Sequence, residues 1–148
     1  MENEVHNNKV GKNHQKEGGK AVLKKQILVV EDDRSSVLYY QELAKIIDLP
    51  GMELFFHYVS SGEEALDYCR KNPVDLVLMD IKLSGMNGWQ AARKIKAEEP
   101  QIVIIAQTAY GLSGDYKKSF EAGCDDHLLK PIDSKDFIQT LYKYLRKP

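Results

Sequence analysis

The stretch Ile27–Asp33, ILVVEDD, decides the fold class, because a short apolar run is followed at once by three acidic residues. A run that is apolar on both faces is typical of a central parallel strand covered by helices on each side. The run IVIIA, at Ile102–Ala106, has the same character. Working outward from these two runs, the sequence predicts three further strands: Glu53–Val59, Val74–Met79 and His127–Leu129.

Amphipathic stretches follow each run and predict five helices. The second helix opens at Ser61 with Glu64 three residues on, the pattern of a capping box, and Pro73 closes it. The other helices are expected at Ser35–Ile47, Trp89–Glu98, Leu112–Ala122 and Ser134–Leu145. Apolar residues recur at helical spacing in the first helix at Val37, Leu38, Leu43, Ile46 and Ile47. Those of the last helix, which Asp133 caps, are Phe137, Ile138, Leu141 and Leu145.

This alternation amounts to five βα units between residues 24 and 148. Right-handed crossovers place helices on both faces of such a sheet, so we expect an open, doubly wound α/β fold with a five-stranded parallel sheet. A closed eight-stranded barrel would need about twice this length. Residues 1–23 are rich in Asn, Lys, Glu and Gly, and this composition predicts a disordered tail or an interdomain linker before the domain.

The near-zero net charge argues against functions that depend on a strong electrostatic field around the whole protein. The 21 basic and 22 acidic residues leave a net charge of -1, which gives no general attraction to nucleic acid or to an anionic membrane. No apolar run is long enough to span a bilayer, so we expect no membrane contact by this domain. Cys69 and Cys124 lack metal-ligand spacing, which is typical of a reducing, cytoplasmic compartment.

Polar residues follow four of the predicted strands, at the point where each strand ends. In chain order they are Glu31, Asp32, Asp33, Asp80, Thr108 and Lys130. Taken singly, Asp32 or Asp33 could cap a helix and Asp80 could be a turn residue. Ligands of an open sheet bind at the carboxyl ends of its strands, however, so these side chains should meet in one crevice. Clustered carboxylates with open positions favour a bound Mg²⁺ ion.

A carboxylate in such a crevice can accept a phosphoryl group as a nucleophile, which gives an acyl phosphate. The protein then has to position the donor and neutralise charge on the transferring oxygens. Lys130 can pair with one phosphoryl oxygen, and Thr108 can donate a hydrogen bond to another. The strand ends therefore predict a phosphoacceptor with a metal ion beside it.

From Gln26 to about Leu145 the chain resembles the response-regulator receiver domains of two-component signalling. The resemblance rests on four stretches: ILVVEDD, DLVLMDIKLSGMNGW, IIAQTAY and AGCDDHLLKPID. It implies a flavodoxin-like, CheY-like sheet with strand order 2-1-3-4-5, and Asp80 as the aspartate that accepts the phosphoryl group. Glu31 and Asp32 would form the acidic pair, with Asp32 the more direct ligand of Mg²⁺.

The resemblance also implies roles for other residues. Lys82 would offer its backbone carbonyl to the metal, Thr108 would be the switch hydroxyl, and Lys130 would precede a cis Pro131. The chain departs from the family pattern at Glu31, where Asp is commoner, and at Ser84, where many receivers carry Pro. His127 stands at the position of the switch aromatic, and its reading as an ordinary strand-edge histidine stays open. Lys82 and Tyr110 lie where the family tunes the rate of dephosphorylation.

The implied partner is a histidine kinase or a histidine phosphotransfer domain. The domain itself is expected to catalyse only its own phosphorylation and dephosphorylation. Its readout face would comprise the helix at Leu112–Ala122, the fifth strand and the last helix, and this face could also form a homodimer. Because no effector follows Leu145, we expect the C-terminal receiver of a hybrid sensor histidine kinase, with a stand-alone regulator as the alternative.

Three rival readings share parts of this pattern. A flavodoxin-like FMN protein needs a phosphate-binding loop after its first strand, where Glu31, Asp32 and Asp33 would repel the phosphate. A haloacid-dehalogenase phosphatase needs two acids one residue apart after its first strand, followed by Thr or Val, and the remaining pattern of this chain does not fit that class. A degenerate receiver would act only as a binding module, and the complete set of strand-end residues argues against it.

Overall fold

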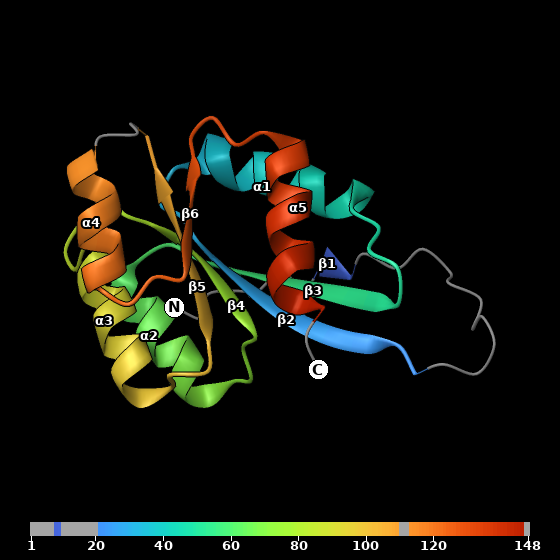
Figure 1. Cartoon of the computed structure of the whole chain (residues 1–148), viewed down its shortest axis with the longest axis horizontal. Coiled ribbons are helices and arrows are strands. Elements are labelled where there is room, and N and C mark those ends of the chain that lie inside the picture. The colour runs from blue at the N-terminus through green and yellow to red at the C-terminus, as the bar shows by residue number, and fades with distance from the viewer. Residues whose placement is uncertain (1–7, 10–20, 110–112, 147–148) are drawn as a thin grey trace.

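The structure of the protein is a computed structural model that describes residues 8–9, 21–109 and 113–146. Within these ranges its strands are β1 (Asn8–Lys9), β2 (Leu23–Val30), β3 (Met52–Val59), β4 (Leu76–Asp80), β5 (Val103–Thr108) and β6 (Asp126–Leu129). The helices are α1 (Arg34–Ile46), α2 (Gly62–Lys71), α3 (Gly88–Glu98), α4 (Ser113–Glu121) and α5 (Ser134–Leu145). From β2 onward strands and helices alternate, as predicted (Figure 1).

The strands form one sheet in the order β1-β3-β2-β4-β5-β6. The five strands from β2 to β6 pair in parallel, and their order among themselves is 2-1-3-4-5, which confirms the predicted fold class. β1 was not predicted, and it pairs antiparallel with β3, with Asn8 opposite Phe56 and Lys9 opposite Phe55. A strand of two residues has no periodicity that a sequence pattern could reveal.

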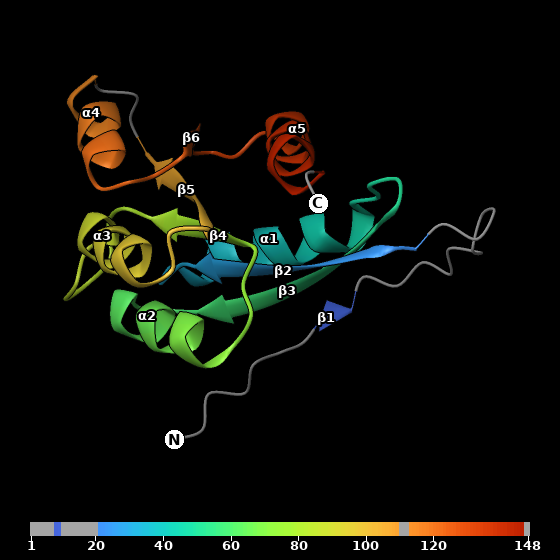
Figure 2. The same cartoon turned by 60° about the horizontal axis from the view of Figure 1, so that its bottom comes forward.

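Helices cover both faces of the sheet, as the right-handed crossovers require. α1 and α5 pack on one face, α2 and α3 pack on the other, and α4 lies next to α3 (Figure 2). Ile27 and Val29 of β2 point into the first cluster of apolar side chains, and Leu28 and Val30 point into the second. All four are fully buried, as expected for a central strand. Within the described ranges, every helix is too short or too polar to cross a bilayer.

The helix caps differ in part from the predicted pattern. Asp33 caps α1, because its carboxylate accepts a hydrogen bond from the backbone N–H of Ser36 at 2.9 Å. At the start of α2, Ser61 accepts from the N–H of Glu64 at 3.1 Å, as a capping box requires. The Glu64 carboxylate, however, accepts from the N–H of Ser60 at 3.2 Å, so the predicted box is only half formed.

The buried face of α1 also differs from the prediction. Leu38 and Ile46 are 52% and 63% exposed, and the side chains that α1 buries are Tyr40, Leu43 and Ala44. Leu43 and Ile47 are buried as the helical spacing predicts, but the pattern missed Tyr40, which supplies the largest buried side chain of this helix. In α5 the predicted stripe is correct, since Phe137, Leu141 and Leu145 are buried and Ile138 is partly buried.

His57 is a buried titratable residue of β3, away from the strand ends. Its Nε2 lies 2.8 Å from Oε1 of Gln26, and its ring faces that of Tyr68 at a centroid distance of 5.5 Å. Its Nδ1 has no hydrogen-bond partner in the described part of the chain. Burial lowers the pKa of His57, because an imidazolium here would lose its hydration.

We therefore predict that acid destabilises the fold through His57. Below the ordinary histidine pKa of about 6.5, the unfolded chain binds a proton at this site more readily than the folded chain does. The free energy of unfolding should then fall with decreasing pH, by at most about 1.4 kcal/mol per pH unit from one proton. Urea unfolding between neutral and mildly acidic pH would measure this slope. It should be smaller in His57→Gln, and equal slopes in the two proteins would contradict the assignment.

Candidate functional site

Three acidic side chains meet at the carboxyl edge of the sheet. Glu31 and Asp32 directly follow β2, and Asp80 is the last residue of β4, the neighbour of β2. Each of the three offers a carboxylate oxygen within 4.8 Å of the others. Glu31 is 1% exposed and Asp80 6% exposed, whereas Asp32 faces solvent. The parallel sheet thus brings together the acids that the sequence pattern predicted to meet.

Lys130 supplies the positive charge of this site. It follows β6, and its Nζ lies 2.6 Å from Oε2 of Glu31 and 3.3 Å from Oδ2 of Asp80. The peptide bond between Lys130 and Pro131 is cis. The ammonium group therefore bridges carboxylates from β2 and β4, although a full strand, β5, separates β4 from β6 in the sheet.

Backbone amides hold the remaining oxygens of the two buried carboxylates. The N–H of Lys82 donates to Oδ1 of Asp80 at 3.1 Å, and the N–H of Asp33 donates to Oε1 of Glu31 at 3.1 Å. Each of the two carboxylates thus accepts a hydrogen bond from its own backbone amide, and both contact the ammonium group of Lys130. Such contacts fix the orientation of each carboxylate before any ligand arrives.

The charges of this cluster shift the proton affinities of its members. Burial and the nearby charge of Asp80 raise the pKa of Glu31, against the opposing hydrogen bond from Lys130. Burial works against the charged form of Lys130, but the bond to Glu31 and the charge of Asp80 outweigh it and raise the pKa of Lys130. Lys130 is therefore held as an ammonium ion, because without a cation the buried carboxylates would repel each other.

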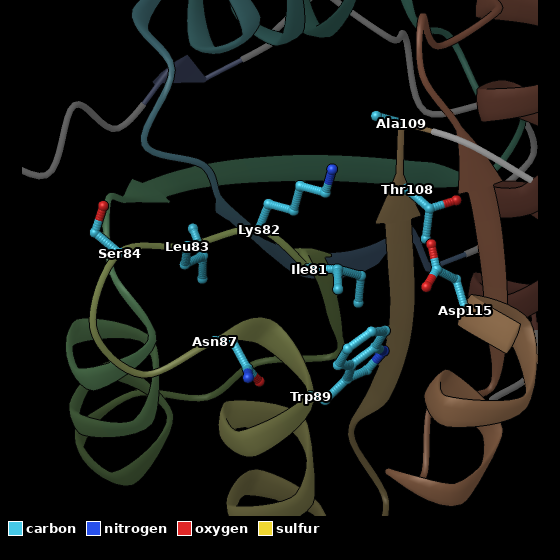
Figure 3. A pocket seen from close by; sticks show the side chains of 9 residues that line it. All are labelled: Ile81, Lys82, Leu83, Ser84, Asn87, Trp89, Thr108, Ala109 and Asp115. Carbon is cyan, nitrogen blue, oxygen red and sulfur yellow. The ribbon is translucent and has the colours of Figure 1, made fainter. Parts of the chain in front are cut away.

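Thr108 ends β5 at the same edge and is 3% exposed. Its Oγ1 has no hydrogen-bond partner among the described residues. It lines a cavity of about 450 Å³ together with Asp115 of α4 and Trp89 of α3. In Figure 3 the side chains of Thr108 and Asp115 lie next to each other, above the indole ring of Trp89. Thr108 thus lies at the wall of an open space that it shares with α3 and α4.

Two buried residues below the site were missed by the sequence analysis. The hydroxyl of Tyr40, on α1, donates a hydrogen bond to Oε1 of Gln107, which precedes Thr108 on β5. Burial raises the pKa of Tyr40, and the charges of Glu31 and Asp80 add to the effect. A polar residue inside the apolar run of β5 was the only sequence signal for this contact, and it does not identify the partner.

Three further positions that the sequence analysis named are His127, Ser84 and Tyr110. The His127 ring packs against Tyr116 of α4, with ring centroids 4.0 Å apart. Ser84 is exposed on the loop between β4 and α3 (Figure 3). Tyr110 lies outside the described residues.

Residues 27–142 match the sequence profile of the response regulator receiver domain. The chain belongs to this family. The polar-differentiation response regulator DivK of Brucella ovis is 34% identical over 123 residues, which cover 82% of this chain and 96% of the relative. The match accounts for nearly all of DivK, so a single receiver domain fills that protein.

Solved structures show the same fold. The receiver domain of the sensor histidine kinase PA1611 from Pseudomonas aeruginosa, crystallised with a magnesium ion in its active-site cleft, is 28% identical with a TM-score of 0.73. That comparison covers 84% of this chain and 99% of the PA1611 chain. The Saccharomyces cerevisiae Ssk1 receiver, crystallised with the phosphotransfer protein Ypd1, is 22% identical with a TM-score of 0.72 over 84% and 91% of the chains. At this identity the Ssk1 comparison speaks for the fold alone.

The donor set at the carboxyl edge fits a hard divalent cation. Glu31, Asp32 and Asp80 offer only carboxylate oxygens, and an exposed Asp32 leaves room for water ligands. Mg²⁺ prefers such oxygens and keeps several waters when it binds to proteins. The cluster is therefore suited to Mg²⁺ rather than to a metal that requires thiolate or imidazole ligands.

We predict that Lys130→Met destabilises the metal-free protein by about 2 kcal/mol, because two buried carboxylates lose their shared counter-charge. Saturating Mg²⁺ should stabilise this variant more than the wild type, since the cation replaces the missing ammonium. Urea unfolding with and without Mg²⁺ measures both effects, and Lys117→Met, on the exposed side of α4, is the control. Equal stability of Lys130→Met and wild type would show that Lys130 does not balance the cluster.

Proposed function

We propose that this receiver domain accepts a phosphoryl group on Asp80 from a phosphohistidine of a histidine kinase or a histidine phosphotransfer domain. The observation that carries the proposal is the position of the Asp80 carboxylate, which lies 3.3 Å from the Lys130 ammonium and within 4.8 Å of carboxylate oxygens of Glu31 and Asp32. Family membership supports the same assignment. The Ssk1 receiver is one family member that was crystallised with a phosphotransfer protein.

In the proposed reaction, an oxygen of Asp80 attacks the phosphorus atom, the bond from phosphorus to the donor imidazole nitrogen breaks, and an aspartyl phosphate forms. Glu31, Asp32, Asp80 and the backbone carbonyl of Lys82 would hold Mg²⁺. At this site the ion would supply positive charge to offset that of the transferring oxygens. Lys130 pairs with one phosphoryl oxygen. Attack of water on the phosphorus later restores the free carboxylate.

The chain would catalyse only these two reactions on itself, within the cytoplasm. Two relatives favour different parent proteins. The match to DivK, which one receiver domain fills, favours a stand-alone response regulator. The likeness to the receiver of the sensor kinase PA1611 favours the C-terminal domain of a hybrid kinase. The proposed chemistry at Asp80 is the same in both.

The proposed switch element is α4, which the fold holds by few contacts. Within residues 114–121, the one buried side chain is that of Ser119, and its hydroxyl accepts a hydrogen bond from Nε1 of Trp89 at 2.9 Å. The Nζ of Lys118 lies 5.1 Å from the centre of the Trp89 ring, and Tyr116 packs on His127. A helix with so little apolar burial can shift at small cost.

Phosphorylation would act on α4 through Thr108. The free hydroxyl of Thr108 can turn to donate a hydrogen bond to the new phosphoryl group, which changes the wall of the cavity that it shares with Asp115 and Trp89 (Figure 3). This movement would bias α4 between two positions. The face formed by α4, β6 and α5, including His127, would then present a changed surface to a partner or to a second copy.

The phosphoacceptor assignment predicts a gain of one phosphoryl group after incubation with acetyl phosphate and Mg²⁺, measured by intact mass. EDTA or Asp80→Asn should abolish the gain. Asp33→Asn is the matched control, because it removes an acid from the same edge while Asn still caps α1. Full phosphorylation of Asp80→Asn would rule out Asp80 as the acceptor.

The weak attachment of α4 predicts that Trp89→Phe loosens this helix. The variant keeps an aromatic ring but loses the hydrogen bond to Ser119, which is worth about 1 kcal/mol. Hydrogen exchange should therefore accelerate about fivefold at the α4 amides, while phosphorylation of Asp80 remains intact. Mass spectrometry of the exchanged protein measures the effect, with Ser119→Ala expected to match. Unchanged exchange in both variants would show that another contact holds α4.

A further inference from the structure

The loop between β4 and α3, residues 81–87, follows Asp80 directly and is closed at its base. The N–H of Gly88 donates to the carbonyl of Ile81 at 3.0 Å, and the N–H of Lys82 donates to the Asp80 carboxylate at 3.1 Å. A Cβ at position 88 would lie 2.2 Å from the Asp80 carbonyl oxygen, so only glycine fits there. The base of the loop is thus locked by its own backbone.

The tip of the loop is held from a different part of the chain. The N–H of Met86 donates to Oε1 of Glu63 at 3.0 Å, and Glu63 lies in the first turn of α2. Hydrogen bonds from its own backbone N–H and from that of Met86 lower the pKa of Glu63, so its carboxylate is ionised at neutral pH. An ionised acceptor makes a stronger hydrogen bond to an amide than a neutral one does.

The backbones of the loop tip and of α2 pack closely around this bond. Gly85 has a φ of 73°, and a Cβ there would lie 3.1 Å from Oε1 of Glu63. A Cβ at Gly62 would lie 2.9 Å from the carbonyl oxygen of Met86. Two glycines therefore allow the approach that the Glu63–Met86 bond needs.

The sequence of the loop explains why a restraint from outside the loop is useful. Residues 81–87 read IKLSGMN, with Ser84 where many receivers carry proline. Proline restricts φ and removes backbone freedom from a loop, whereas serine and glycine leave it. The hydrogen bond from Met86, two residues after Ser84, to Glu63 of α2 can restrain the loop in place of a proline.

We propose that Glu63 is a positioning residue, which holds the loop after Asp80 in the geometry that presents the Lys82 carbonyl to Mg²⁺. The proposal rests on the function proposed above for Asp80 and its metal site. Glu63 does not contact the acidic cluster through any described hydrogen bond and acts through the loop backbone.

The neighbouring Glu64 provides a matched comparison. It has the same charge and lies in the same first turn of α2, so it has a similar favourable interaction with the helix dipole. Its carboxylate, however, accepts hydrogen bonds from the N–H and the hydroxyl of Ser60, and not from the loop. Loss of Glu64 should therefore leave the loop in place.

The test compares Glu63→Ala, Glu63→Gln and Glu64→Ala with the wild type. Mg²⁺ affinity is measured by titration calorimetry, and hydrogen exchange at Met86 is measured in the metal-free protein. We expect Glu63→Ala to weaken Mg²⁺ binding about threefold and to accelerate exchange at Met86 by a similar factor. Glu63→Gln should lie between the wild type and Glu63→Ala, because its neutral amide oxygen still accepts the bond, although more weakly than a carboxylate does. Glu64→Ala should stay close to the wild type.

The outcomes distinguish a failure of the positioning role of Glu63 from a failure of the proposed metal site. If Glu63→Gln binds Mg²⁺ as weakly as Glu63→Ala, the charge rather than the loop contact matters, and the positioning role is wrong. Unchanged exchange at Met86 in Glu63→Ala would overturn it as well. If the wild type binds no Mg²⁺, the proposed metal site fails, and with it the role of Glu63 toward Mg²⁺. Faster exchange at Met86 would then assign Glu63 only to holding the loop.

Discussion

The contact on which the rest of the site depends is the one between Lys130 and the buried carboxylates of Glu31 and Asp80. Two carboxylates can be withdrawn from water together only if a cation or several donors compensate their charge. The parallel sheet makes this arrangement possible, because it ends β2 and β4 side by side and places Lys130, directly after β6, where its side chain reaches both carboxylates. The Asp80 carboxylate is thereby held close to positive charge.

Around this site, rigid and weakly held parts are clearly separated. β4 and the second half of β2, Ile27–Val30, are buried on both faces, and apolar side chains from four helices pack against them. α4 is attached instead through a hydrogen bond, a cation over a ring and one ring contact. A fold that fixes its acidic cluster and leaves one adjacent helix loosely attached can convert a local change of charge into a movement of its surface.

The loop after Asp80 connects these two parts. Gly88 allows the chain to turn back against Asp80, and Glu63 reaches the loop from α2. The same loop leads into α3, whose first turn carries Trp89 and so contacts α4. The acidic cluster and α4 are thus joined through a segment of seven residues, 81–87, and the first turn of one helix.

The sequence by itself determined the order of strands and helices and the meeting of Glu31, Asp32, Asp80 and Lys130, with Thr108 at the same edge of the sheet. Runs apolar on both faces reveal central strands, and the ends of parallel strands share one edge. Only the tertiary structure decided which partners meet across elements, such as Tyr40 with Gln107 and Glu63 with Met86, or that α1 exposes Leu38. Periodicity reports the local repeat of the backbone, whereas these contacts depend on how each helix is rotated against the sheet, which packing alone sets.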